Sequence, residues 1–307
     1  MTLSDGAVER LRAAVRAPDL AGTRYRLLRL LGSGGMGAVY EAEDTALGRN
    51  VALKVLELPD EGGALEARLV AEARVLGLLE HPGIVPVHDV GTLEDGRVFY
   101  AMKRVEGERL DIHVARVGPV AERLRLFLRV AETVAFAHAR GVLHRDLKPQ
   151  NVMVGAFGEV LVIDWGLAKA LGEEPGAAGA VLGTPGYMSP EQLAGAAVDA
   201  RSDVWSLGAL LAFLLGAPAS GVAPKRVPRA LRAIAAKAQA REREARYPSV
   251  EALAADVSAY LAGEPVAADP EGPARRLGRL LVRHRVAVFL VLAYLAARVL
   301  VLLFVKR

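Results

Sequence analysis

The chain of 307 residues has 39 Lys and Arg against 35 Asp and Glu, a formal net charge of +4, and no cysteine. The length predicts about two structural units, and the lack of cysteine excludes a disulfide scaffold, thiol nucleophiles and thiolate zinc sites. The mean hydropathy of +0.26 is high for a soluble domain and points to a membrane segment. No early apolar run follows a basic start, which disfavours a cleaved secretory signal.

The first half of the chain reads mainly as strands. Residues 1–24 form an N-terminal extension, in which Leu11 and Val15 predict a short exposed helix over residues 5–16. A helix with one apolar side is predicted over residues 65–79. Around it lie five strand-like runs that predict an antiparallel sheet, at residues 24–32, 38–43, 50–58, 84–92 and 97–105.

After residue 105 helical periodicity dominates, and no repeat of 20 to 50 residues interrupts it. Helices are predicted over residues 122–139, 201–215 and 230–262. A β-rich part followed by a helical part makes the fold class α+β with two lobes.

A glycine cluster in the first hairpin carries the first chemical signal. Gly32, Gly34 and Gly37 fit the pattern G-x-G-x-x-G, in which backbone N–H groups approach phosphate oxygens without a Cβ in the way. A strand follows the glycines where a dinucleotide-binding fold needs a helix, so we expect a hairpin lid over phosphates. The next strand holds Lys54 among apolar residues, either as a site residue with a buried partner or as an edge lysine that reaches solvent.

Four further motifs follow in order. They are HRDLKPQN at residues 144–151, DWG at 164–166, GTPGYMSPE at 183–191 and DVWSLG at 203–208. With the glycine loop and VALK at 51–54, they resemble the motifs of bacterial, eukaryotic-like (Hanks-type) Ser/Thr protein kinases, with Trp replacing the usual Phe in DWG. The resemblance covers about residues 25–262 and implies a bilobal kinase domain there.

The resemblance implies a role for each polar motif residue. Lys54 is expected to hold the α- and β-phosphates, with Glu72 as its ion-pair partner and Glu66 as the competing candidate. Asp146 is expected to accept the proton of the attacking hydroxyl, and Lys148 to neutralise the transferred phosphoryl group. The implied metal ligands are Asn151 and Asp164. The implied ATP-binding residues are Leu31, Gly32, Ser33, Gly34, Gly35, Met36, Gly37, Val39, Ala52, Lys54, Met102, Val105 and Met153.

The implied function is transfer of the γ-phosphoryl group of ATP to Ser or Thr of a protein substrate. ATP and Mg²⁺ are the expected cofactors, with Mn²⁺ as the alternative metal, and no nucleic-acid partner is expected. The alternative function is a pseudokinase scaffold that binds nucleotide or partners without transfer.

Three departures from the family pattern carry consequences. Residues 167–182 contain no Ser, Thr or Tyr, so loop phosphorylation before Thr184 is excluded there. Arg145, which usually faces a loop phosphate, either pairs with Glu173 or Glu174 or leaves them as solvated carboxylates. The stretch between residues 215 and 230 is short for the family, and Lys103 and Arg104 stand where an acidic residue is common. Arg246 is still expected to pair with Glu191.

The C-terminal segment predicts a membrane anchor. Residues 263–285 read as a basic juxtamembrane linker, and the apolar residues 286–305 are long enough as a helix to cross a bilayer core of about 30 Å. Five arginines precede this stretch, which places the kinase domain in the cytoplasm by the positive-inside rule, for a single-pass protein. Arg298 interrupts the stretch, and the alternative is an amphipathic helix on the membrane surface or against the kinase domain.

Overall fold

The N-terminal lobe is a five-stranded sheet with one helix. The computed structural model describes residues 17–34, 37–56, 63–165, 169–170, 184–217, 226–270, 289–291 and 293–298. All pairings in the sheet are antiparallel, in the order β1-β2-β3-β5-β4. The strands are β1 (Tyr25–Gly34), β2 (Gly37–Asp44), β3 (Arg49–Val55), β4 (Val87–Thr92) and β5 (Val98–Lys103), and the helix is α2 (Ala64–Leu78). The predicted sheet and helix are confirmed.

The two faces of this sheet pack into different cores. On one face Val98 and Tyr100 of β5 join Leu69 and Leu76 of α2. On the other face Phe99 and Ala101 pack with Leu20 and Tyr25. This alternation follows from the two-residue period of a strand, which turns successive side chains to opposite faces. Leu20 ties the segment before β1 to the lobe, whereas the helix predicted over residues 5–16 lies outside the described residues.

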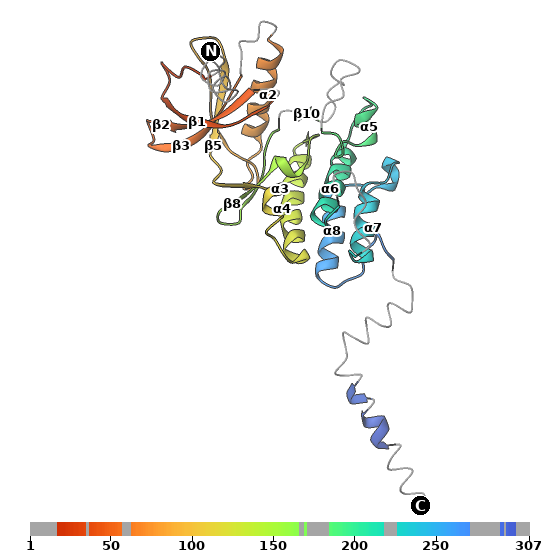
Figure 1. Cartoon of the computed structure of the whole chain (residues 1–307). Coiled ribbons are helices and arrows are strands. Elements are labelled where there is room, and N and C mark those ends of the chain that lie inside the picture. Colours follow the sequence, from red (N-terminus) through yellow and green to blue (C-terminus); the bar gives the residue numbers. More distant parts are fainter. Residues whose placement is uncertain are drawn as a thin grey trace, which may run out of the picture.

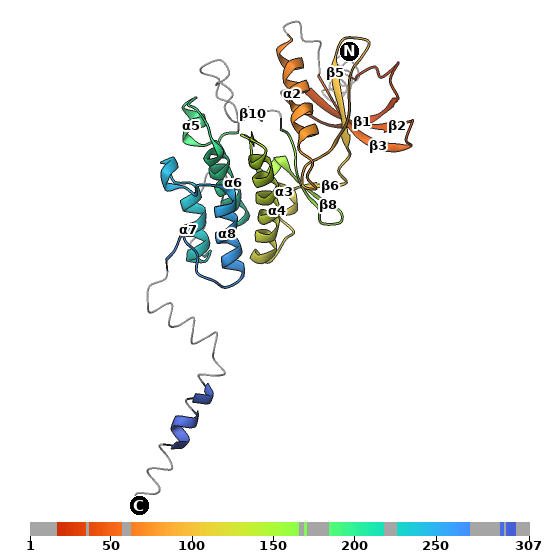
Figure 2. The same cartoon turned by 180° about the vertical axis from the view of Figure 1, so that it is seen from behind.

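The C-terminal lobe is mainly helical, and Figures 1 and 2 show it as a separate part below the sheet. Its helices are α3 (Leu110–His113), α4 (Val120–Ala139), α5 (Pro190–Leu193), α6 (Ala200–Leu214), α7 (Arg229–Ala238) and α8 (Val250–Leu261), with the 3-10 turns η1 (Pro149–Asn151) and η2 (Arg243–Ala245). A small sheet of order β6-β8-β9 contains β6 (Gly107–Arg109), β8 (Val152–Gly155) and β9 (Val160–Val162), and β7 (Val142–Leu143) pairs with β10 (Lys169–Ala170).

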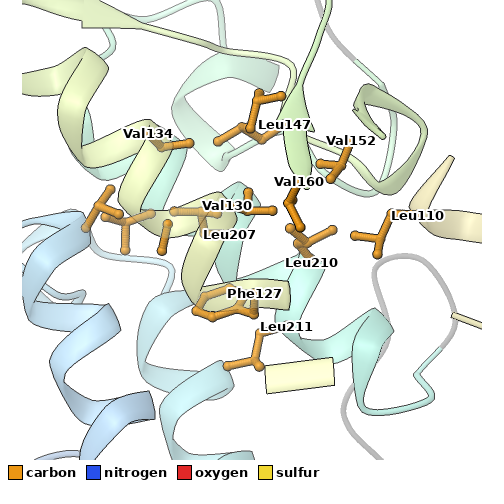
Figure 3. Close-up of a cluster of buried hydrophobic side chains, with 14 of the residues drawn as sticks. Leu110, Phe127, Val130, Val134, Leu147, Val152, Val160, Leu207, Leu210 and Leu211 are labelled. Atoms are coloured by element: carbon orange, nitrogen blue, oxygen red, sulfur yellow. The ribbon is translucent and has the colours of Figure 1, made fainter. Parts of the chain in front are cut away.

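The core of this lobe lies between α4 and α6. Phe127, Val130 and Val134 of α4 meet Leu207, Leu210 and Leu211 of α6, and Leu147 joins them from the loop before η1 (Figure 3). All seven side chains are buried. Each contributes about 1.5–3 kcal/mol of burial free energy, so the loop that contains Leu147 is anchored in the core of the lobe.

The prediction of one helix over residues 230–262 is wrong. The structure divides this stretch into α7, η2 and α8. Two residues set the start of α8: Pro248 cannot continue the backbone hydrogen-bond pattern, and Ser249 caps α8 by accepting a hydrogen bond from the Ala252 N–H at 3.3 Å. Arg246 lies inside the break, where the irregular backbone lets its side chain turn inward.

The folded part extends into the predicted linker of residues 263–285. Val266 is buried, and the Asp256 carboxylate of α8 accepts hydrogen bonds from the N–H groups of Ala267 at 2.6 Å and Ala268 at 3.0 Å. The folded part therefore includes the first residues of the predicted linker, up to the end of this described range at residue 270.

Of the predicted membrane span, the structure describes residues 289–291 and 293–298, which are helical and exposed. In the described part of the chain, no helix has both the length and the apolar composition needed for a membrane crossing.

Candidate active site

Lys54 is buried in the middle of the sheet and bonded to α2. Its strand β3 lies between β2 and β5, so the alternative of an edge lysine is wrong. The Nζ atom donates to both carboxylate oxygens of Glu72, at 2.8 and 2.7 Å, and the two residues are only 8% and 3% exposed. The competing residue Glu66 is exposed on the same helix. Burial lowers the pKa of Lys54, but the charges of Glu72 and Asp164 outweigh it and raise the pKa above its usual value.

Tyr100 is a member of this cluster that the sequence analysis did not identify. Its hydroxyl donates to Glu72 Oε1 at 3.0 Å, and its ring centroid lies 5.9 Å from Lys54 Nζ. In sequence it is one apolar position of a strand among several. Only the register, which sets Tyr100 opposite Lys54, reveals the contact.

Asp164 joins the same cluster from the segment after β9. Its Oδ1 lies 3.2 Å from Lys54 Nζ, and its backbone is left-handed with a φ of 63°. Burial raises the pKa of Asp164, but the charge and hydrogen bond of Lys54, together with His144 and Lys148, outweigh it and lower the pKa, so the group is ionised at neutral pH. The next residue, Trp165, is buried, packs against the His144 ring at a tilt of 52° with ring centroids 4.6 Å apart, and donates from Nε1 to the Val162 carbonyl. The tryptophan of DWG thus anchors the Asp164 backbone in the core.

A buried carboxylate of α6 holds the loop that carries Asp146. Asp203 accepts the backbone N–H groups of His144 and Arg145, both at 2.9 Å, and contacts His138 Nε2 at 2.7 Å. Burial raises the pKa of Asp203, and these hydrogen bonds and the nearby histidines lower it by more. Arg145 has a φ of 70°, a conformation that costs a non-glycine residue about 1–3 kcal/mol. The Asp203 bonds offset this strain, so α6 fixes the backbone next to Asp146.

Asp146 lies at the centre of a second polar network. Lys148 Nζ donates to its Oδ2 at 2.7 Å, and the Thr184 hydroxyl donates to its Oδ1 at 2.9 Å. Lys148 also contacts Thr184 Oγ1 at 2.6 Å, and Asn151 Nδ2 donates to Asp146 Oδ2 at 3.1 Å. Thr184, from the motif at residues 183–191, was not among the predicted catalytic residues. The network orients the carboxylate through both oxygens.

Asn151 and Asp164 fit the predicted role in metal binding by their donor chemistry. The amide nitrogen of Asn151 donates to Asp146, its amide oxygen is a potential metal ligand, and Asp164 keeps 42% of its side chain exposed. Hard divalent cations such as Mg²⁺ prefer oxygen ligands, and with phosphate groups they need only one or two from the protein.

The predicted ATP-binding residues come from both lobes. Gly34 and Gly37 pair at the end of the β1–β2 hairpin, as expected for a lid, and a Cβ on Gly37 would lie 2.3 Å from the Val55 carbonyl oxygen. Leu31, Gly32 and Ser33 are exposed on β1. Gly35 and Met36 lie outside the described residues.

The remaining predicted ATP-binding residues surround the junction of the lobes. Val39 pairs with Lys54 across β2 and β3, and Ala52 pairs with Met102 across β3 and β5. Met153 lies on β8, which Figures 1 and 2 show between the sheet and the C-lobe helices, and Val105 lies in the connection from β5 to β6. The predicted pairings of Arg145 with Glu173 or Glu174 fall on residues outside the described ranges.

The predicted pair of Glu191 and Arg246 is confirmed. Arg246 donates to both carboxylate oxygens of Glu191, at 2.7 and 2.8 Å, and Ser202 donates to Glu191 Oε1 at 2.6 Å. Burial raises the pKa of Glu191, and the hydrogen bonds from Arg246 and Ser202 outweigh it and hold the pKa at about 2. The Arg246 guanidinium also lies over the Trp205 ring at 5.1 Å. This buried ion pair fixes the end of the motif at residues 183–191, which also contains Thr184.

Comparison with known proteins agrees with this geometry. Residues 25–249 match the protein kinase domain family. The chain is 34% identical over 294 residues to the serine/threonine-protein kinase PknD of Chlamydia caviae, covering 79% of this chain and 32% of the relative. It is 35% identical over 300 residues to PknD of Chlamydia trachomatis serovar D, with 79% and 32% covered. The chain spans about a third of the length of the curated relatives it matches.

Proposed function

Because this chain belongs to the protein kinase family through residues 25–249, we propose that it transfers the γ-phosphoryl group of ATP to Ser or Thr hydroxyls of proteins. The observation that carries the proposal is the pair of polar networks built from motifs far apart in sequence. Lys54, Glu72 and Asp164 form one, and Asp146, Lys148, Asn151 and Thr184 form the other. The similarity to serine/threonine-protein kinases of Chlamydia supports the same activity.

In this reaction a bond forms between the substrate oxygen and the γ-phosphorus, and the bond from that phosphorus to the bridging oxygen breaks to release ADP. The Asp146 carboxylate orients the hydroxyl and accepts its proton. Lys148 lies 2.7 Å from that carboxylate, where it neutralises charge on the phosphoryl group in flight. Lys54 holds the α- and β-phosphates. Mg²⁺, held by Asn151 and Asp164, would neutralise charge on the phosphates.

Two sequence features favour the pseudokinase alternative, the lack of Ser, Thr and Tyr in residues 167–182 and the short stretch between residues 215 and 230, but the family match and the similar kinases support the enzyme. All six polar residues of the expected machinery are present and each makes at least one side-chain hydrogen bond in the two networks. The direct test is transfer of labelled phosphate from ATP to a generic basic protein, with the Asp146→Asn chain beside it. Transfer by the unmodified chain that is lost in Asp146→Asn supports the proposal. Nucleotide binding without any transfer by the unmodified chain contradicts it.

We also propose that the chain is anchored in a membrane by residues 286–305, with the kinase domain in the cytoplasm. The support is the sequence: the stretch is apolar except for Arg298, and five arginines precede it against Lys306 and Arg307 after it. A central arginine costs about 2.5–3.5 kcal/mol for insertion, and each Leu, Val or Phe returns about 0.3–0.6 kcal/mol. The many apolar residues therefore roughly offset Arg298, and insertion is marginally favourable.

We expect the full chain to fractionate with membranes and to resist extraction by alkaline carbonate, which removes peripheral proteins. A chain that lacks residues 275–307 should be released into the soluble fraction, because it has lost both the arginines and the apolar stretch. Replacing Arg298 by leucine should make extraction harder still. Carbonate extraction of the full chain would contradict the spanning helix and favour a helix on the membrane surface.

A further inference from the structure

Tyr100 occupies a position from which it reaches the ion pair of Lys54 and Glu72 directly. In the antiparallel pairing of β3 and β5, Tyr100 lies directly opposite Lys54, so both side chains leave the sheet on the same face. This is the face covered by α2, since Tyr100 packs in the core that contains Leu69 and Leu76. The Tyr100 hydroxyl ends 3.0 Å from Glu72 Oε1, and the residue is 2% exposed.

Lys54 and Tyr100 both donate hydrogen bonds to Glu72, but Lys54 also has other partners. Lys54 donates to both oxygens of Glu72 and also to Asp164 at 3.2 Å, and in the proposed reaction it has to serve the ATP phosphates as well. Within the described part of the chain, Glu72 is the only hydrogen-bond partner of the Tyr100 hydroxyl. When Lys54 shifts toward a phosphate, Tyr100 is therefore the donor that stays with the carboxylate.

We propose that Tyr100 is a positioning residue of the active site: its hydroxyl holds Glu72, and with it α2, in the arrangement that leaves Lys54 available to the phosphates. The inference rests on the proposed kinase function. Tyr100 touches neither the nucleotide nor the reacting atoms in this assignment. It acts through Glu72, and loss of their buried hydrogen bond leaves Glu72 Oε1 dependent on Lys54, the second donor to this oxygen.

The protonation of Glu72 links this bond to pH. Burial raises the pKa of Glu72, and the charge and hydrogen bonds of Lys54 and the Tyr100 hydroxyl oppose that effect, while Asp164 adds to it. These groups face the carboxylate from β3, β5 and the segment after β9. From β4, which also packs against α2, Asp89 bonds instead to Tyr25 on the opposite face of the sheet, and His88 is influenced by Arg49, Asp44 and Arg24. Loss of the Tyr100 donor therefore raises the pKa of Glu72 further and disfavours the ion pair as pH falls.

The test is Tyr100→Phe in the full chain, which removes one oxygen and keeps the ring in the core. We expect kcat/KM for ATP to fall about tenfold at neutral pH, the loss expected for one buried hydrogen bond to a charged group. The ratio of variant to wild-type kcat/KM should fall further as pH is lowered, because Glu72 protonates earlier in the variant. A kcat/KM of Tyr100→Phe equal to that of the wild type, with an unchanged pH profile, would overturn the proposal.

Tyr25→Phe is the matched control. The Tyr25 hydroxyl also donates to a carboxylate, that of Asp89, at 3.0 Å, and Tyr25 is also buried in the same lobe, but on the opposite face of the sheet. Both substitutions remove one hydroxyl from a carboxylate, so a merely structural effect would lower thermal stability in both. Only Tyr100→Phe is expected to move the pH profile. An equal change in the profile of Tyr25→Phe would overturn the proposal.

A cycle with Glu72→Gln tests whether the two residues act together. Once Glu72 has lost its charge, Tyr100→Phe should add less than about a twofold loss, because both changes remove one interaction. A full tenfold further loss would overturn the proposal.

If Tyr100→Phe does not fold, 3-fluorotyrosine at position 100 supplies the test: it keeps the hydroxyl as a stronger donor and should shift the acid limb of the pH profile of kcat/KM to lower pH. An unshifted limb overturns the proposal in that case.

These outcomes separate the inference from the proposed function. A wild-type chain without phosphoryl transfer refutes the kinase assignment itself. A wild-type chain that transfers phosphate, beside a Tyr100→Phe chain that is indistinguishable from it at every pH, refutes only the role of Tyr100.

Discussion

Replacing Asp164 by asparagine is expected to lower phosphoryl transfer by at least about a hundredfold while the fold stays intact. The substitution removes the negative charge that lies 3.2 Å from Lys54 Nζ and that would hold Mg²⁺ at the phosphates. Electrostatic groups aimed at the reacting phosphates supply most of the catalysis in this kind of reaction, and loss of one such group costs about 10²–10³-fold. Because the Asp164 side chain is 42% exposed, its neutralisation leaves little uncompensated charge in the interior.

Lys54→Met is expected to have an effect of similar size for the complementary reason. It removes the positive charge that the proposed function assigns to the α- and β-phosphates, and among the described residues it leaves Glu72 with the Tyr100 hydroxyl as its one side-chain donor. Arg49→Met, at the exposed start of the same strand β3, removes a cation that has no assigned role in the reaction and should keep the wild-type rate. Circular dichroism of each variant separates lost catalysis from lost structure.

A second matched pair lies on α2. Glu72→Gln should lower transfer strongly, whereas Glu66→Gln changes an exposed carboxylate of the same helix and should not. Rates are measured with saturating Mg²⁺ and ATP. Wild-type transfer by Asp164→Asn under these conditions would contradict the assigned metal site, and equal losses in Glu66→Gln and Glu72→Gln would contradict the assigned partner of Lys54.

The sequence could predict the architecture because its motifs and periodicities act locally. The five strands and the helix α2 follow from short apolar runs separated by turn residues, and these need no knowledge of distant contacts. The residues expected to take part in the reaction lie inside motifs whose order resembles that of protein kinases, and this resemblance implies a two-lobed fold. The sequence did not decide whether Glu72 or Glu66 meets Lys54, because both carboxylates lie on one helix. The choice depends on which face of α2 packs on the sheet.

Two features depended on tertiary contacts that no local pattern contains. Tyr100 reads as a core aromatic, and its hydroxyl becomes meaningful only when the register sets it opposite Lys54. The break between α7 and α8 reads as helix over most of its length, since Arg243 and Ala245 favour helices, but the bonds of Arg246 to Glu191 outweigh that local preference. In both cases a buried polar bond decided the outcome.

Glu191→Gln is expected to destabilise the C-lobe by about 3–5 kcal/mol at neutral pH, because it leaves the Arg246 guanidinium buried without its carboxylate. The effect depends on pH in a direction set by the lowered pKa of Glu191, about 2 instead of 4.5. Since the folded state holds the proton less tightly than the unfolded state, this stabilisation, roughly 3 kcal/mol, is complete above pH 4.5 and is lost as pH falls through about 2.

The urea concentration at the unfolding midpoint of the wild-type chain should therefore decrease as the pH is lowered from 4.5 to 2. The midpoint of Glu191→Gln should change less, so that plots of midpoint against pH for the two chains converge at low pH. The two tryptophans, Trp165 and Trp205, both belong to the C-lobe, and their fluorescence reports its unfolding. Glu132→Gln, on the exposed side of α4, should follow the wild-type curve at every pH. Parallel plots of urea midpoint against pH for wild type and Glu191→Gln, from pH 7 to pH 2, would contradict the prediction. The Glu191–Arg246 pair stabilises the fold through the ionised carboxylate, so its contribution must be lost when that carboxylate is protonated.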